Sequence, residues 1–319
     1  MFDRRYAGRG CGLLQRNDEI MWLKNLMLYR IAEGTVDDAD VLNDKLSQDI
    51  LQPCGGYQME TRGWLPPRDE GRYVYQQNKH WLITLGDEQK ILPATIIRQQ
   101  ADERAKAVEQ QQGRPVGRKQ MREIRDQVTN ELMPRALAQR RTTHAWIDSG
   151  NALLAIDTGA TAKAEAFMEA LRRSDDDARA RRIDTKRSPA AAMAEWLTKG
   201  EAPGAFGIDQ DLELRASDAS KATVRYARHS LEGKEIRDHL AAGKTVVKLG
   251  LTWNDRISFV LTEELQIKRL VFLDILRRES DSEAGDEEER FDIDFTLMTG
   301  ELSLMLRDLL KALGGEKDD

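Results

Sequence analysis

Two neighbouring segments are rich in helix-forming residues but contain few apolar ones, and this feature most restricts what the chain can fold into. They comprise residues 98–112 and 119–131, and a break at residues 113–117, with Gly113, Pro115 and Gly117, separates them. This pattern favours two helices joined by a tight turn. Because such helices have little apolar surface to bury, we expect a helical hairpin that projects from the body. A helix of about 15 residues would reach roughly 22 Å.

Strand patterns on both sides of this hairpin predict antiparallel sheet. Residues 26–31 are typical of a strand, and Thr35 is expected to cap a following helix, with Asp38 completing a capping box. Two strand hairpins are expected, the first turning at Gly86-Asp87 between residues 81–85 and 90–92. The second turns at residues 149–151 between residues 145–148 and 152–156.

The C-terminal half shows the same mixture of helices and strands. Residues 161–173 and 189–197 have the spacing of amphipathic helices, and the Asp- and Arg-rich residues 174–186 are a candidate linker between two bodies. A strand meander is expected over residues 245–253, 256–262 and 266–273. Leucines and methionines between residues 302 and 313 form a helical stripe that Gly314 closes. The fold class is therefore α+β, with antiparallel sheets, packed helices and a projecting helical tip.

The charge of the chain is −6 overall but is unevenly distributed. Residues 275–319 hold 14 acidic and six basic residues, whereas residues 94–146 hold 11 basic and six acidic ones. A second basic stretch, residues 221–237, holds five basic and two acidic residues. Two basic islands in an acidic chain can bind a polyanion locally. Aromatic residues are scarce in both, so the pattern favours phosphate contact on a duplex over base stacking on single strands.

Other motifs favour structural roles over catalysis. No apolar run is long enough to span a membrane and no signal peptide is recognisable, so we expect a cytoplasmic protein. Two cysteines, Cys11 and Cys54, cannot form a disulfide framework, and a small buried thiol is the favoured interpretation of Cys54. Asp292 and Asp294 resemble the carboxylate pair of a metal-dependent nuclease. Because they alternate with Phe291, Ile293 and Phe295, we expect a half-buried strand instead.

A series of short motifs in one order resembles the RdgC family of recombination-associated proteins. The resemblance covers residues 21 to about 316, and residues 1–20 would be a disordered N-terminal extension. The motifs are MWLKNLM (21–27), PCG (53–55), GWLPP (63–67), KILP (90–93), LMPRA (132–136), WID (146–148), AGK (242–244), FDIDF (291–295) and LMTGEL (297–302).

The resemblance implies a bacterial nucleoid protein that closes as a homodimeric ring around duplex DNA, without sequence preference, and restrains the RecA recombinase. It implies neither catalysis nor a cofactor. It also implies a central domain (residues 21–93 and 133–185), an inserted helical tip (94–132) and a C-terminal base (186–319), with dimer contacts at tip and base. By motif position it places Arg135, Arg228 and Lys244 on the inner, DNA-facing surface. The resemblance also implies an aromatic residue near the tip contact at the position where this chain has Leu137.

We therefore expect a non-enzymatic protein that neutralises DNA phosphates with cations of both basic islands. Two other function classes stay open: a metal-dependent nuclease that uses Asp292 and Asp294, and a protein adaptor that acts on the recombinase directly. The expected DNA contacts are Arg104, Lys106, Arg118, Lys119, Arg122, Arg125, Arg135, Arg225, Arg228 and Lys244.

Overall fold

The computed structural model describes residues 22–32, 38–68, 71–273 and 287–317. The expected disordered tail and the expected cap Thr35 lie outside these residues. An α+β fold is confirmed: its centre is one 12-stranded sheet whose strand pairs are all antiparallel. None of the described helices is long and apolar enough to cross a membrane.

The main path of the sheet runs β2-β4-β5-β6-β1-β12-β11-β10-β8-β9, and β3 and β7 pair outside this path with β4 and β1. The strands are β1 (Leu26–Ile31), β2 (Glu60–Leu65), β3 (Val74–Gln77), β4 (His80–Ile91), β5 (Leu137–Asp148), β6 (Leu153–Ile156), β7 (Ala180–Arg182), β8 (Phe206–Ala216), β9 (Thr223–Tyr226), β10 (Lys244–Trp253), β11 (Ile257–Thr262) and β12 (Gln266–Phe272).

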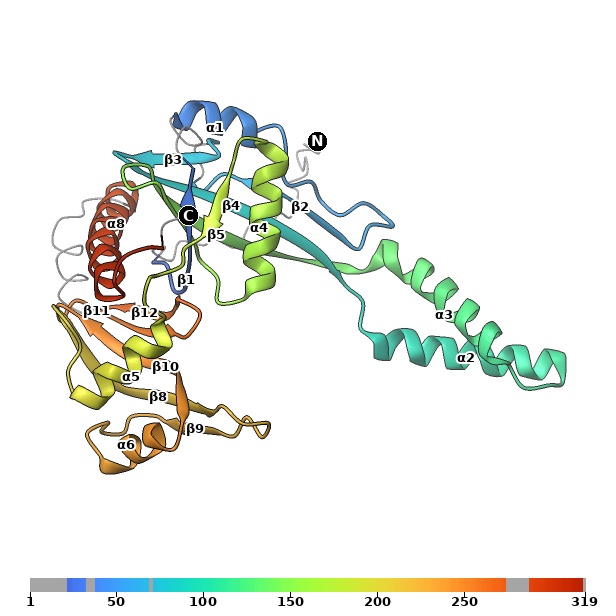
Figure 1. Cartoon of the computed structure of the whole chain (residues 1–319). Coiled ribbons are helices and arrows are strands. Elements are labelled where there is room, and N and C mark those ends of the chain that lie inside the picture. Colours follow the sequence, from blue (N-terminus) through green and yellow to red (C-terminus); the bar gives the residue numbers. More distant parts are fainter. Residues whose placement is uncertain (1–21, 33–37, 69–70, 274–286, 318–319) are drawn as a thin grey trace, which may run out of the picture.

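Helices cover parts of both faces of this sheet (Figure 1). They are α1 (Ala39–Leu46), α2 (Ala94–Gln112), α3 (Arg118–Leu132), the 3-10 helix η1 (Met133–Arg135), α4 (Thr161–Ser174), α5 (Pro189–Lys199), α6 (Lys234–Ala241) and α8 (Glu287–Ala312).

Strand β1 shows how the two faces receive different cores. Because successive side chains of a strand point to opposite faces, Met27 and Tyr29 join the core formed with α1 and α4. Leu26 and Leu28 join the larger core formed with α5, α6 and α8. The latter core continues across β8, β10, β11 and β12. On the opposite face of these four strands, most polar side chains stay at least partly exposed, Thr262 and Gln266 being buried exceptions, and no helix of the described residues covers this face.

Helices α2 and α3 form the arm, which projects well beyond the sheet (Figure 1). The arm has a small core of its own, in which Ile124 and Val128 of α3 pack with Ala101 and Ala105 of α2. The turn begins at Gly113, whose φ of 67° lies in the left-handed region that glycine adopts readily. The expected projecting helical hairpin is confirmed, and α2, at 19 residues, is about 28 Å long.

The expected turn at Gly86-Asp87 is wrong, because β4 continues without interruption through both residues. Every residue of β4 pairs with β5, and Gly86 lies opposite Thr142. A Cβ atom at Gly86 would lie 2.6 Å from Leu65 Cδ1 and 2.7 Å from Leu51 Cδ2. The glycine therefore allows close packing against the strand, and a turn is not formed.

The start of α1 and the segment between α4 and α5 also differ from the expectations. Asp38 is itself the N-cap of α1, and its carboxylate accepts the backbone N–H of Asp40 at 2.8 Å. Within the expected linker, β7 pairs with β1, so this segment is part of the sheet. The expected hairpin at residues 149–151, helices α4 and α5, the meander β10-β11-β12 and the helix end at Gly314 are confirmed.

Candidate nucleic-acid interface

Helix α3 presents a row of cations on one side of the arm. Arg118, Arg122 and Arg125 are separated by four and three residues, so they lie on one helix face. These three arginines, together with Lys119 and with Lys106 of α2, are exposed. None of the five makes an ion pair or side-chain hydrogen bond with another described residue. Their charges are therefore available to a polyanion.

Arg104, also an expected contact, is engaged within the arm. Its Nη1 donates to Glu131 Oε1 at 2.8 Å, and its Nη2 contacts the second carboxylate oxygen. The hydrogen bond from Arg104 lowers the pKa of Glu131. Glu131 is nine residues from Arg122, which corresponds to two and a half helical turns. The Arg104–Glu131 pair therefore joins α2 to α3 on the side of α3 opposite the cation row.

A buried lysine fastens the root of the arm. Lys90 is 6% exposed. Its Nζ donates to three backbone carbonyls, those of Gly55 at 2.7 Å, Gly56 at 2.6 Å and Met133 at 3.0 Å. Met133 opens η1, in which Arg135 is exposed. Lys90 thus holds the C-terminal end of the arm and the loop at residues 52–59 against strand β4.

Glu88, two residues before Lys90, strengthens the same region. Its carboxylate accepts the backbone N–H of Cys54 at 2.8 Å and Arg140 Nη2 at 2.9 Å. Burial alone would raise the pKa of Glu88, but these hydrogen bonds hold it below its ordinary value. The Cys54 thiol donates to the Glu88 carbonyl at 3.1 Å and is only partly buried. Cys54 is therefore a structural residue of the arm root, as expected, although its thiol is only partly buried.

The second basic island lies around β9 and α6. Arg228 is exposed and has a φ of 52°, and its side chain forms no hydrogen bond or ion pair with another described residue. Lys244 Nζ lies 2.9 Å from His239 Nδ1. The ring of Tyr226 packs near the rings of His229 and His239, with centroids 5.5 and 6.4 Å away. His229 Nδ1 lies 2.8 Å from the carbonyl oxygen of Ser230, so both histidines have a polar partner.

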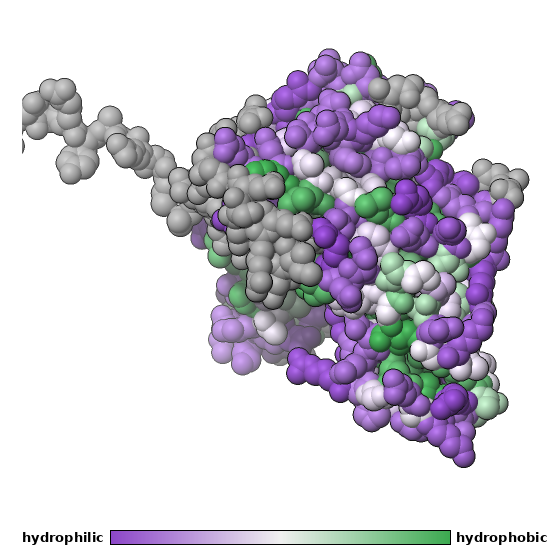
Figure 2. All heavy atoms as spheres, turned by 90° about the vertical axis from the view of Figure 1, so that its left-hand side faces the viewer, coloured by the Kyte–Doolittle hydropathy of each residue, from purple (hydrophilic) through white to green (hydrophobic). Residues whose placement is uncertain are grey.

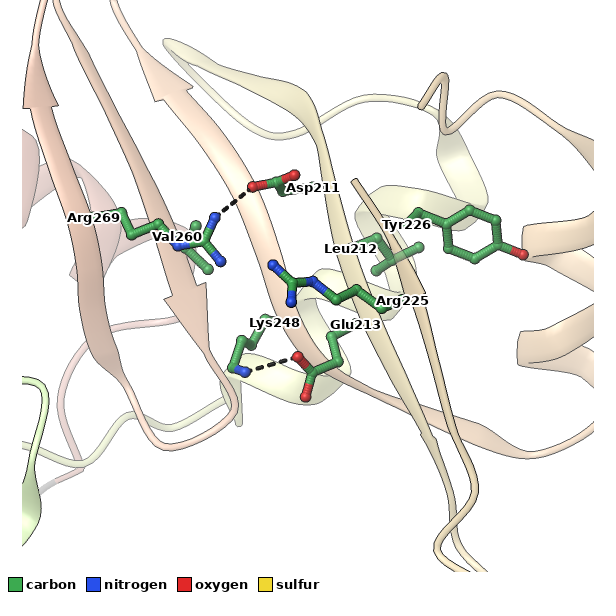
Figure 3. Close-up of a pocket in the computed structure, with 8 residues that line it drawn as sticks. All are labelled: Asp211, Leu212, Glu213, Arg225, Tyr226, Lys248, Val260 and Arg269. Carbon is green, nitrogen blue, oxygen red and sulfur yellow. Dashed lines mark hydrogen bonds and ion pairs between the residues drawn. The ribbon is translucent and has the colours of Figure 1, made fainter. Parts of the chain in front are cut away.

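Arg225 of β9 enters a shallow pocket on the uncovered face of the sheet (Figure 3). It lies between two ion pairs: Arg269 Nη1 with Asp211 Oδ2 at 2.8 Å, and Lys248 Nζ with Glu213 Oε2 at 2.7 Å. Arg225 itself forms no ion pair with any described residue. The pocket thus gathers three cations from three strands.

Sequence reasoning missed Lys248 and Arg269, although a signal for their surface was present. In β8, the buried Leu212 and Leu214 alternate with Asp211 and Glu213, which is typical of a strand with one polar face. The charged residues of the neighbouring strands come close to this polar face only because β8 pairs with β10 and β9. This pairing places Glu213 opposite both Lys248 and Arg225.

The two parts of the interface do not touch, but they project in one direction. In Figure 1 the arm and the β8-β9 hairpin both extend to the right of the body, while α5, α6 and α8 lie to the left. The uncovered sheet face lies on the side away from α5, α6 and α8. Seen from the side that carries α8, the exposed residues are mostly hydrophilic and the apolar ones form small patches (Figure 2).

The strand expected around Asp292 and Asp294 is wrong, because both lie in helix α8. Phe295, Met298 and Leu302 are buried at spacings of three and four residues. This helical period continues to Leu313 and overrides the short alternation from Phe291 to Phe295. Two residues apart on a helix, the carboxylates do not share a face.

Asp292 has a structural role in the packing of α8. Its Oδ1 accepts Arg68 Nη1 and the Tyr75 hydroxyl, both at 2.7 Å. The Arg68 guanidinium also lies 4.8 Å from the Phe291 ring centroid. Burial, together with the hydrogen bond to Asp292, raises the pKa of Tyr75. These contacts tie α8 to β3 and to the loop before it.

The described residues contain no group of three or more histidine, cysteine, aspartate or glutamate side chains that could hold a metal ion. A second cluster resembles a catalytic triad only in composition. Asp148 accepts Ser303 Oγ at 2.7 Å, and His80 Nδ1 lies 4.0 Å from the same oxygen. Because the carboxylate, not the histidine, bonds the hydroxyl, this arrangement does not activate a serine as a nucleophile.

Comparison with known proteins gives consistent matches over nearly the whole chain. A family model described as "Putative exonuclease, RdgC" matches residues 21–316. The recombination-associated protein RdgC of Dechloromonas aromatica (strain RCB) is 48% identical over 299 residues, which cover 93% of this chain and 98% of that protein. The protein of the same name from Janthinobacterium sp. (strain Marseille) is 47% identical over 296 residues, covering 93% of this chain and 99% of that protein.

Proposed function

Because the chain belongs to the RdgC family, we propose that it binds duplex DNA without sequence preference and encircles it as a homodimer. In this proposal the protein has no catalytic activity. It limits recombination by occupying DNA that the RecA recombinase would otherwise coat, in the nucleoid of the cytoplasm.

The observation that carries this proposal is the set of exposed cations on the arm that form no ion pair with any residue the structure describes. Arg118, Arg122 and Arg125 form a row along one side of α3. Cations of this kind bind backbone phosphates, and such contacts do not read the base sequence. Arg225, which forms no ion pair within the described part of the chain, supplies a further cation on the sheet face that lies away from α5, α6 and α8. A duplex held between arm and sheet would meet both.

An exposed apolar pair at the root of the arm supports a dimer. Leu137 is 79% exposed, and its cross-strand partner Ile91 is 49% exposed. Ile96 in the first turn of α2 is 44% exposed. Large apolar side chains grouped on an otherwise polar surface are typical of contact sites. We assign them to the contact with the partner's arm, which closes one side of the ring.

The experiment compares retention of the protein on closed and linear DNA. A closed ring leaves a short linear duplex by sliding off an end, but it cannot do so on a covalently closed circle. At the same salt concentration, dissociation should therefore be much slower from circles than from linear DNA of the same length. Deletion of the arm, residues 98–131, behind a short Gly-Ser linker should erase this preference. Equal dissociation rates of the wild-type protein from both substrates would contradict the ring.

A further inference from the structure

The pocket around Arg225 contains its own anions. Asp211 and Glu213 of β8 stand on either side of Arg225 (Figure 3). Each carboxylate already holds one of the other two cations, Asp211 that of Arg269 and Glu213 that of Lys248. A phosphate that enters the pocket meets one unpaired cation and two that are occupied.

Stability does not explain these two ion pairs. The side chains of Arg269 and Asp211 are 54% and 34% exposed, and those of Lys248 and Glu213 are 34% and 22% exposed. Ion pairs with this exposure contribute little to stability because water and salt screen them. Leu212 and Leu214, which alternate with Asp211 and Glu213 along β8, already fix the strand in the core. The carboxylates therefore act mainly on the electrostatic potential of this face.

The same pattern extends along the uncovered sheet face. Arg215 of β8 is paired with Glu263. Asp209 accepts the hydroxyls of Thr252 at 2.8 Å and Ser258 at 3.2 Å. On this surface, acidic and basic side chains are therefore present in nearly equal numbers, whereas the row on the arm contains only cations.

We propose that the Arg225 pocket is a phosphate subsite whose affinity Asp211 and Glu213 limit by competing with the DNA backbone for Lys248 and Arg269. The inference rests on the proposed function. Each cation released from its carboxylate would neutralise one more phosphate. A duplex held by such weak contacts can move along the sheet face while the dimer keeps it enclosed.

The test removes the competing charges and keeps the side-chain shapes. Asp211→Asn with Glu213→Gln is compared with Asp40→Asn with Asp184→Asn, whose carboxylates pair with Arg72 and Lys317 elsewhere. Both double variants change the net charge equally. Affinity for a 30-base-pair duplex is measured by fluorescence anisotropy over a series of salt concentrations.

The pocket variant should bind about tenfold tighter at 0.1 M salt, and its slope of log affinity against log salt should steepen by about 0.9 to 1.8. The control variant should match the wild type. Adding Arg225→Gln to the pocket variant should reduce the magnitude of this slope by about 0.9. Thermal melting shows that each variant is folded, and the single variants Asp211→Asn and Glu213→Gln serve if the double variant is not.

Two results would overturn the inference and are distinguishable. If the wild type binds DNA but the pocket variant binds no tighter than the control variant, the competition is refuted while the proposed function stands. If neither the wild type nor the pocket variant binds DNA, both are refuted.

Discussion

Replacing Arg118, Arg122 and Arg125 of α3 by glutamine should weaken DNA binding by a calculable amount. The three side chains lie on one helix face and have no ion-pair partner among the described residues. If each neutralises one phosphate, the slope of log affinity against log salt should fall by about 0.9 for each arginine, or about 2.7 for each arm that contacts the duplex. At 0.1 M salt this corresponds to a loss of up to roughly 500-fold.

The matched control is Arg104→Gln with Glu131→Gln, which removes a paired cation together with its carboxylate on the other side of the arm. This control should leave the slope unchanged. Arginine and glutamine have similar helix propensities, so circular dichroism should show the same helix content in all variants. Binding is measured with duplexes of scrambled sequence over a salt series. A triple variant with the wild-type slope would refute the assignment of this row to DNA phosphates.

Three further predictions concern the arm root, the sheet and α8. Lys90→Met leaves three backbone carbonyls without their donor, of which only that of Met133 belongs to a buried residue, and should lower the free energy of unfolding by about 1–3 kcal/mol in urea titrations, whereas Lys79→Met on an exposed loop should change it little. Burial of His144 lowers its pKa to about 4, from an ordinary value of 6.5. The contribution of the neutral ring to the free energy of unfolding is therefore complete above pH 6.5 and is lost as the pH falls from 6.5 towards 4. His144→Gln should therefore remove up to about 3 kcal/mol of the loss of stability between pH 7 and pH 4, and an identical pH dependence in both proteins would contradict this. Asp292→Asn with Asp294→Asn should leave DNA binding unchanged, and magnesium-dependent DNA cleavage by the wild type that disappears in this variant would favour the nuclease instead.

Local sequence patterns predict the arm and the meander because their own residues determine them. In α3, Ile124 and Val128, with Met121 and Leu132, supply a narrow apolar stripe and most other positions are polar, so helix propensity and solvation act in the same direction. The strands β10, β11 and β12 show alternation that pairs within one continuous stretch of chain. In both cases the interacting residues are close in sequence.

The failures arise where distant residues decide the outcome. Gly86 reads as a turn, but Leu51 and Leu65 pack against it and β5 pairs along its whole strand. The five residues around Asp292 alternate as in a strand, yet a longer apolar period and contacts with Arg68 and Tyr75 place them in a helix.

For the candidate site, the sequence indicated the basic islands but not the pairing of charges within them. Arg104 and Glu131 are 27 residues apart and meet only because α2 and α3 pack antiparallel. Lys248 and Arg269 come next to Arg225 only through the order of strands in the sheet. Such pairings depend on tertiary structure, so composition can locate a basic segment without showing which of its charges are available.

The Lys90 anchor has a mechanical consequence for assembly. The arm projects from the sheet, and its helix α2 is about 28 Å long. At its base, the ammonium group of Lys90 donates hydrogen bonds to three backbone carbonyls. A rotation of only 5° at this base would displace the far end by about 2.5 Å, enough to misalign two side chains that must meet across a subunit contact. If the protein assembles as the proposed homodimer, the stiffness of the hydrogen bonds at Lys90 would limit how accurately two copies can join.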